Sequence, residues 1–153
     1  MQSFEIETDL CIPAEKAWSH MTSPSGVNAE FWPIMRMTFP PTVGDVTSDW
    51  QPGRQLFRSW LLLFGIVPVE YDDFGLEEVD RGKRFLEISE MMSQEKWIHE
   101  REITEIPKGV RLRDRVSFVS RLASLERVYL VVFRLVFRYR HFRLKRLYGR
   151  AAV

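Results

Sequence analysis

Apolar and polar residues alternate with a period of two near the start of the chain, over residues 3–11. This period places successive side chains on opposite faces of a β-strand, so we predict a half-buried strand here. Its buried face is expected to carry Phe4, Ile6, Thr8 and Leu10. Cys11 follows in the same apolar stretch, and we expect its thiol to be packed in the core.

Two short helices are predicted directly after this strand. Pro13 suits the first turn of a helix, where a missing N–H is not costly, and residues 14–21 follow it. On this helix Ala17, Trp18 and Met21 form the apolar side. The pair Ser23-Pro24 predicts the start of the second helix, which Pro33 ends.

The middle of the chain consists of strand-like segments separated by turn residues. These segments are 55–64, 66–79, 83–92, 96–106 and 110–121. Short turns such as Arg81-Gly82 and residues 107–109 place neighbouring segments at hairpin spacing. Strands at this spacing pair with their neighbours along the chain, so we predict an antiparallel meander.

A long helix is predicted over residues 122–148, because no glycine or proline interrupts them and Gly149 fits a C-cap. At about 27 residues it would be roughly 40 Å long. Helical spacing predicts an apolar face of Leu125, Val128, Tyr129, Val132, Leu135, Val136, Tyr139 and Phe142. The opposite face would hold Arg127, Arg134, Arg138, His141 and Lys145.

The middle of this helix is apolar nearly all round, because Leu130, Phe133 and Phe137 lie outside the predicted face. We expect the two short helices, or a partner subunit, to cover them. Together the patterns predict a single α+β domain over residues 1–153, with a curved antiparallel sheet wrapped around a long C-terminal helix. The aromatic content of 13% is high and would suit either a bulky core or a lined cavity.

The net charge is +1, but charged residues are unevenly distributed along the chain. Residues 1–100 carry 8 basic and 17 acidic residues, and residues 101–153 carry 14 and 4. The basic end could complement the helix dipole, dock on the acidic part of the chain, or contact an anionic membrane surface. We do not expect nucleic-acid binding.

The chain offers few groups for metals or export. Its one cysteine and three histidines show no metal-ligand spacing, and no cofactor-binding motif occurs, so we expect neither a metal nor a cofactor. The N-terminus lacks the basic start and apolar run of a signal peptide, and no apolar run is long enough to span a membrane. These features predict a cytoplasmic protein.

Strand parity brings several ionisable side chains together. If the more apolar face of each central strand points inward, Glu87, His99, Arg101 and Asp114 meet inside an apolar cup. Buried charges need partners, so we expect cross-strand pairs between Glu87 and Arg101 and between Asp114 and His99. The set could anchor a ligand head group, or it could be an ion-pair network that only fixes strand register.

The order of elements resembles a known family. The opening FEIETDLCIPAEKAWSHMTSPSGVN is similar to that of the START-like superfamily, also called polyketide cyclase/dehydrase-like or SRPBCC, in which a first strand runs into x-P-A-E-x-x-W. Four further segments resemble the meander of this superfamily: RSWLLLFGIVPVEYDD, FLEISEMM, KWIHERE and LRDRVSF. The closing segment FRYRHFRLKRLYG resembles its long helix. The resemblance implies a helix-grip fold with a cavity for lipids, polyketides or isoprenoids. It carries over no catalytic residue, because the superfamily has no single catalytic motif.

We therefore expect a small apolar ligand between the sheet and the long helix. The expected ligand-binding residues are Trp60, Phe85, Glu87, Trp97, His99, Arg101, Asp114, Phe118, Tyr129 and Val132. Two alternatives stay open. One is a cyclase- or dehydratase-type enzyme that uses His99, as a possible general base, with Glu87 or Asp114. The other is an interaction module or homodimer that uses Leu130 and Phe137 on the outside of the long helix.

Overall fold

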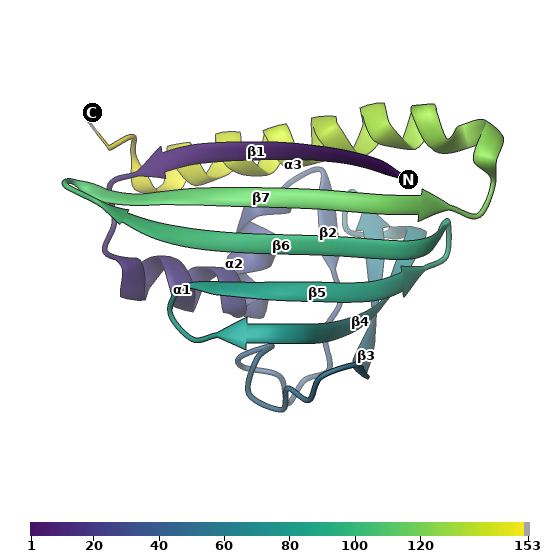
Figure 1. Ribbon diagram of the computed structural model, residues 1–153, viewed down its shortest axis with the longest axis horizontal. Helices are drawn as coiled ribbons and strands as arrows, with labels where there is room; N and C mark the ends of the chain where they lie inside the picture. Colours follow the sequence, from purple (N-terminus) through teal and green to yellow (C-terminus); the bar gives the residue numbers. More distant parts are fainter. Residues whose placement is uncertain (152–153) are drawn as a thin grey trace.

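The structure, a computed structural model, describes residues 1–151 as a curled antiparallel sheet that holds a long helix (Figure 1). The sheet has seven strands in the order β1-β7-β6-β5-β4-β3-β2. The strands are β1 (Gln2–Leu10), β2 (Met35–Met37), β3 (Arg54–Leu63), β4 (Val67–Asp80), β5 (Arg84–Met91), β6 (Gln94–Ile106) and β7 (Gly109–Ser120). The helices are α1 (Ala14–Thr22), α2 (Pro24–Phe31) and α3 (Glu126–Tyr148), with a 3₁₀ turn at Ala123–Leu125. This is the predicted α+β architecture.

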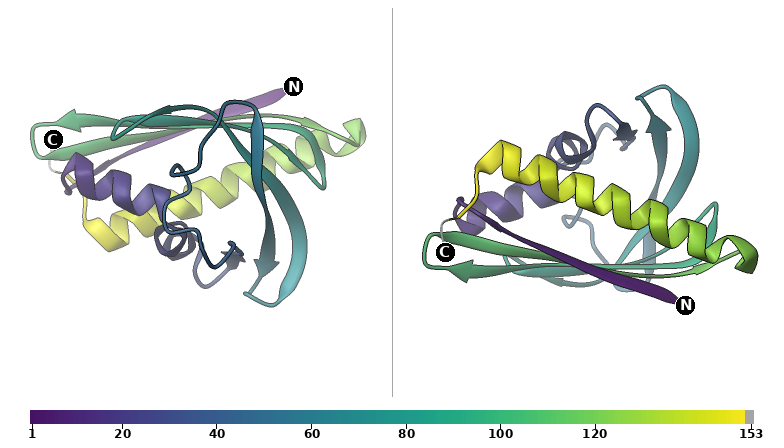
Figure 2. Two further views of the ribbon diagram at one scale, coloured as in Figure 1. Left: turned by 90° about the horizontal axis from the view of Figure 1, so that it is seen from below. Right: turned by 90° about the horizontal axis from the view of Figure 1, so that it is seen from above.

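The sheet is strongly curved. Register shifts interrupt the β3–β4 ladder twice and the β4–β5 ladder once, and such bulges bend the strands that carry them. Figure 2 shows the result: β3 and the first part of β4 turn away from the plane of β5, β6 and β7. Side chains of these two strands and of α3 line a cavity between them. The first strand closes the other edge, where β1 pairs with β7 and contacts α3.

The predicted inner faces of the central strands are confirmed by burial. The buried residues are Phe85, Glu87, Ser89 and Met91 of β5, Trp97, His99, Arg101 and Ile103 of β6, and Leu112, Asp114, Val116 and Phe118 of β7. The alternate residues of these strands carry ion pairs on the convex face, such as that between Arg115 and Glu100. Period-two alternation identified these faces because the alternate positions carry most of the charged side chains, among them Glu100, Arg113 and Arg115.

The core consists of two apolar clusters with a polar layer between them. One cluster includes Leu10, Leu76, Leu112 and Leu144, and the other includes Phe4, Trp97, Phe118 and Phe137. Along β6 the side chains of His99 and Arg101 lie between Trp97 of one cluster and Ile103 of the other. The sheet and α3 contribute to both clusters, so the polar layer crosses the centre of the molecule.

Cys11 is exposed, so the prediction of a packed core thiol is wrong. Leu10, the last residue of β1, is fully buried. The next side chain along an extended segment points to the opposite side, which places Cys11 outside the core.

The long helix begins later than predicted. Its first residue is Glu126, and it has 23 residues, which corresponds to about 35 Å. The preceding 3₁₀ turn takes up three of the residues assigned to the helix. The predicted C-cap is confirmed, because Gly149 has a φ of 75° and its N–H donates to the carbonyl of Lys145.

The predicted apolar face of α3 is correct only at one edge, where Tyr129 and Val136 pack against the core. The buried residues of the helix are Phe137, Arg140, His141 and Leu144, whereas Val128, Leu135 and Phe142 of the predicted face are more than half exposed. Phe137 and Leu130 therefore do not form an outward surface; Phe137 is buried and Leu130 packs against the same cluster. The reason is chemical: the core under this helix contains carboxylates, so the helix buries an arginine and a histidine there.

The short helices pack near the C-terminal half of α3. Tyr139 donates its hydroxyl hydrogen to the carbonyl of Trp32 at 2.6 Å, and Arg143 donates to the carbonyl of Ala29. Leu130, Phe133 and Phe137 pack in the cluster that contains Trp97 and Phe118 of the sheet, so the expectation that the short helices cover them is wrong. Within the described chain, no helix is long and apolar enough to cross a membrane.

Candidate functional site

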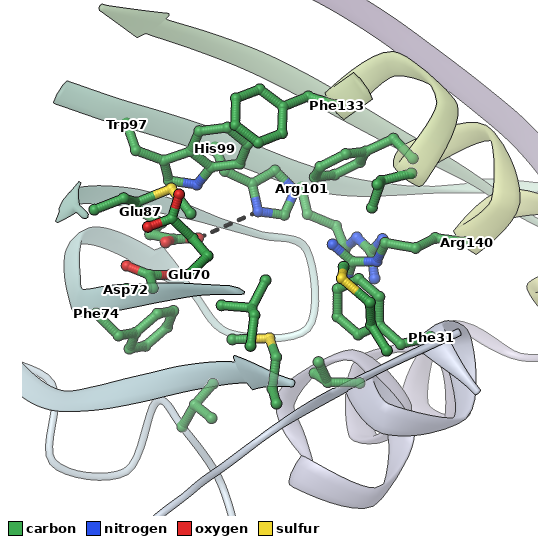
Figure 3. A pocket seen from close by; sticks show the side chains of 18 of the residues that line it. Phe31, Glu70, Asp72, Phe74, Glu87, Trp97, His99, Arg101, Phe133 and Arg140 are labelled. Carbon is green, nitrogen blue, oxygen red and sulfur yellow. Dashed lines mark hydrogen bonds and ion pairs between the residues drawn. The ribbon is translucent and has the colours of Figure 1, made fainter. Parts of the chain in front are cut away.

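A cavity of about 290 Å³ lies between the concave face of the sheet and the helices (Figure 3). Its size is just below the range of roughly 300–1,000 Å³ that is usual for small-molecule sites. Most of its wall is apolar and includes Phe31, Leu61, Phe74, Trp97, Phe133 and Val136. Its polar residues are Glu70, Asp72, Glu87, His99, Arg101 and Arg140.

Seven of the ten expected ligand-binding residues line this cavity. They are Phe85, Glu87, Trp97, His99, Arg101, Tyr129 and Val132. Asp114 and Phe118 are fully buried behind this wall, where Asp114 binds Arg101 and Phe118 contacts Phe133. Whether the seven bind a ligand stays a prediction.

Trp60 does not belong to the cavity, and its assignment there is wrong. Its side chain is 39% exposed and packs edge-on against Tyr71. The neighbouring Leu61 lines the cavity in its place. The segment around Trp60 is apolar on both faces, so alternation gave no means of choosing the inner one.

Sequence reasoning missed several polar residues of the site. Glu70 and Asp72 on β4 share the inner face with Phe74, and a period-two pattern could have indicated them. No sequence pattern indicated that Glu30 and Arg140 would belong to the site. Glu30 lies on a short helix, and Arg140 had been assigned to no face of the long one.

Arg101 binds two carboxylates that come from different layers of the fold. Its Nε and Nη2 atoms donate to the two oxygens of Asp114 on β7, each at 2.7 Å. Its Nη1 and Nη2 atoms donate to the two oxygens of Glu30 on α2, each at 2.9 Å. Two bidentate contacts on one guanidinium hold α2 against the sheet.

Helix α3 completes this network. Arg140 Nε donates to Glu30 at 3.1 Å, and its guanidinium lies 4.7 and 4.8 Å from the ring centres of Phe31 and Phe137. Nε2 of His141 lies 2.8 Å from Asp114 Oδ2. The polar layer therefore connects the sheet, α2 and α3 at one point.

The charges in this layer are mutually stabilised. Burial alone would raise the pKa of Glu30, but Arg101 and Arg140 outweigh it and hold that pKa far below its usual range. Burial would also raise the pKa of Asp114, and Arg101 and His99 lower it well below normal. Both carboxylates are therefore ionised at neutral pH.

One of the two predicted cross-strand pairs is confirmed and the other is wrong. His99 Nε2 lies 2.7 Å from Asp114 Oδ1, as expected. Glu87, however, contacts His99 Nδ1 at 3.3 Å and not Arg101. The strand register explains this, because Glu87 lies opposite His99 and Arg101 lies opposite Asp114.

His99 thus has a carboxylate at each ring nitrogen. Burial lowers the pKa of His99, but Asp114 and then Glu87 outweigh it, and the net pKa is raised above the ordinary value. The raised pKa favours the protonated imidazole, which suits a proton donor better than the general base expected from the sequence. Any exchange of its proton with a molecule in the cavity must first break one of these two contacts.

The opposite side of the cavity is acidic. Glu70 is satisfied, because its oxygens accept hydrogen bonds from the backbone N–H groups of Tyr71 and Ser93 and from the Ser93 hydroxyl. Asp72 differs: its Oδ1 atom is buried and makes no hydrogen bond. Burial raises the pKa of Asp72 well above normal, and the charge of nearby Glu87 and a hydrogen bond with it raise it further.

Within residues 1–151, no group of three or more His, Cys, Asp and Glu side chains is placed to hold a metal ion. The carboxylates of the polar layer are instead engaged by arginine and histidine.

A curled antiparallel sheet around a long C-terminal helix, with a cavity between them, defines a protein of the helix-grip α+β class. Within this class the chain belongs to the family DUF8410, a domain of unknown function, whose model matches residues 8–148. No curated protein matches the sequence.

Solved structures of similar fold have low sequence identity. Protein CV1439 from Chromobacterium violaceum has a TM-score of 0.73 at 13% identity, with 97% of this chain and 99% of that chain covered. DynU16, a protein of the dynemicin biosynthetic locus, has a TM-score of 0.60 at 12% identity, with coverage of 99% and 50%. Ara h 8.0201, a Bet v 1-like protein, has a TM-score of 0.60 at 11% identity, with coverage of 94% and 97%. At these identities the likeness establishes the fold, which is consistent with the START-like resemblance of the sequence.

Proposed function

We propose that this protein binds a small, mainly apolar molecule in the cavity between the sheet and α3. The observation that carries the proposal is the cavity itself, an apolar space with a few convergent polar groups on its wall. Its apolar wall includes Tyr129, Val132 and Val136 of α3 together with Leu61 and Val69 of the sheet. The fold shared with DynU16 and Ara h 8.0201 supports a ligand-binding role, with a lipid, polyketide or isoprenoid as the expected class.

Native mass spectrometry of the protein purified from its own host tests the proposal. We expect an additional mass that denaturing solvent releases as an apolar molecule. Val136→Trp should remove this mass, because the larger side chain fills the cavity that Val136 lines. The matched control is Val131→Trp, on the exposed side of the same helix, which should retain it. Equal ligand occupancy in both variants would contradict binding in this cavity.

A second candidate function is catalysis on a similar molecule, with a protein of the cyclase or dehydratase type as the model. The contact series Glu87–His99–Asp114 favours it, because two of these three residues line the cavity and the histidine lies between two carboxylates. We rank it second, because both nitrogens of His99 are occupied and no free one faces the cavity.

His99→Gln separates the two functions once the released ligand is known. If His99 transfers a proton, the variant should still bind the ligand but fail to convert it. Unchanged conversion would remove His99 from any mechanism. Parallel loss of binding and conversion would assign His99 to the architecture of the cavity.

A further inference from the structure

The cavity is chemically asymmetric. Its guanidinium groups, Arg101 and Arg140, are both engaged with Glu30. The carboxylates Glu70, Asp72 and Glu87 lie on the side formed by β4 and β5 (Figure 3). Among the described residues, Glu70 and Asp72 have no salt bridge to a cation. A ligand in this cavity therefore meets an acidic end whose charge the protein has not neutralised with arginine or lysine.

Asp72 is the one member of this group with an unused buried atom. Its side chain lines the cavity and the residue is only 5% exposed, yet Oδ1 has no hydrogen-bond partner. An unpaired buried polar atom is costly, and such atoms are rare in folded proteins. A ligand group that donates a hydrogen to Oδ1 would remove this cost.

The neighbouring hydroxyl groups donate elsewhere. Ser59, directly opposite Asp72 on β3, donates to the carbonyl of Thr38 at 2.6 Å. Ser89 on β5 donates its single hydrogen to Glu87 at 2.9 Å. Ser89 also lies close enough to Asp72 to lower its pKa, but with its hydrogen directed to Glu87 the Oδ1 atom of Asp72 has no partner.

We propose that Asp72 Oδ1 accepts a hydrogen bond from a hydroxyl group of the ligand, so that the ligand is an apolar molecule carrying an alcohol or phenol at the end near β4. The inference rests on the proposed function, since it concerns the same cavity. A hydroxyl fits better than an ammonium group. Burial raises the pKa of Asp72 and so favours its neutral form, which a neutral hydroxyl matches and a cation does not.

The test compares three probes of one shape by equilibrium dialysis: 2-naphthol, 2-methylnaphthalene and the cation 2-naphthylmethylammonium. We expect the wild-type protein to bind 2-naphthol about tenfold more tightly than 2-methylnaphthalene, the usual effect of one buried hydrogen bond. Asp72→Leu should reduce the preference to less than about twofold, because leucine has a similar shape and no acceptor. Asp72→Asn should retain it, because its amide oxygen is an acceptor.

Asp73→Asn is the matched control, because Asp73 lies next to Asp72 on β4 but pairs with Arg58 on the outer face. It should leave the preference unchanged. Thermal unfolding of each variant by circular dichroism verifies that it is folded, and Asp72→Asn keeps the test valid if the leucine variant is not.

Each other outcome overturns the inference in a distinguishable way. Equal affinity for 2-naphthol and 2-methylnaphthalene in the wild type would refute it and leave apolar binding in the cavity intact. Tightest binding of the ammonium probe, lost in Asp72→Asn, would replace the hydroxyl by a cation. If no probe binds, the proposed function fails together with the inference.

Discussion

Arg101 has the most consequential environment of any single residue in the structure. It is 1% exposed, and it makes four hydrogen bonds to the carboxylates of Asp114 and Glu30. These two carboxylates cannot reach water, so their ionised state depends on the cation between them. Removal of one partner from a buried ion pair leaves an uncompensated charge, which costs more than the pair contributes when intact.

Arg101→Met should therefore reduce the free energy of unfolding by about 3–5 kcal/mol. Arg115→Met on the next strand is the control. The Arg115 side chain is 47% exposed and pairs with Glu5 and Glu100 on the outer face, so its loss should cost less than about 1 kcal/mol. Urea unfolding measures both values. Similar losses in the two variants would contradict the structural role of Arg101.

Replacement of Asp72, unlike that of Arg101, is expected to stabilise the protein. Its folded pKa is raised well above the unfolded value of 3.8, so the folded state binds more protons between these two values. Stability contributed by the protonated group is complete below pH 3.8 and falls as the pH rises through the folded pKa.

Asp72→Asn should thus be more stable than the wild type at pH 8, by at least about 1 kcal/mol, and this gain should shrink as the pH is lowered toward 4. Urea unfolding at pH 4.5, 6 and 8 measures the dependence. Asp80→Asn, at the exposed end of the same strand, is the control and should show no comparable gain. A gain that is constant with pH would place its origin outside the titration of Asp72.

Among the elements, α3 best shows how local pattern and packing differ. Its sequence contains apolar residues on several sides, so helical periodicity alone admits more than one buried face. Packing against the sheet determines the buried face. On this face Phe137 contacts Phe4 and Trp97, and Arg140 and His141 bind buried carboxylates. The face predicted from the sequence includes Leu135, which is 57% exposed.

Two substitutions on α3 test this assignment. Phe137→Ala should destabilise the protein by about 3–5 kcal/mol, because it leaves a void between the helix and the sheet. Leu135→Ala, only two residues earlier, should change stability by about 0.5 kcal/mol or less. Thermal or urea unfolding would give the comparison. A larger effect of Leu135→Ala would restore the face expected from the sequence.

At the scale of the whole molecule, the polar layer connects two apolar clusters into one core. Each cluster contains residues of the sheet and of α3, for example Leu112 with Leu144 and Trp97 with Phe137. The ion pairs of Arg101 add α2 to the same unit. Because no part can separate without exposing both apolar surface and charge, we expect the fold to unfold cooperatively.

Urea unfolding followed by tryptophan fluorescence and by far-ultraviolet circular dichroism should therefore give coincident transitions with a single midpoint. Fluorescence reports on Trp97 and the other tryptophans, whereas circular dichroism reports largely on α3. An earlier loss of helical signal would mean that α3 detaches before the sheet unfolds.

The sequence by itself determined the order of elements, the meander and the inner faces of the three central strands. Period-two alternation is a local property, and it fixes which side chains share a face as soon as a segment is extended. It also placed His99 near Asp114. It could not place Trp60, because that strand is apolar on both faces, and it could not show that Arg101 would reach Glu30 on a helix about 70 residues earlier.

Only the tertiary structure decided which face of α3 is buried, how the charges pair and where the cavity lies. An ionised carboxylate is costly to bury without a cationic partner, and the partner can be distant in the sequence. Arg140 and His141 therefore lie on the buried side of α3, and leucine and valine side chains lie on its exposed side. The cavity depends in the same way on the bends in β3 and β4, which set the distance between the sheet and the helix. These are properties of three-dimensional contact, and no local pattern in the chain specifies them.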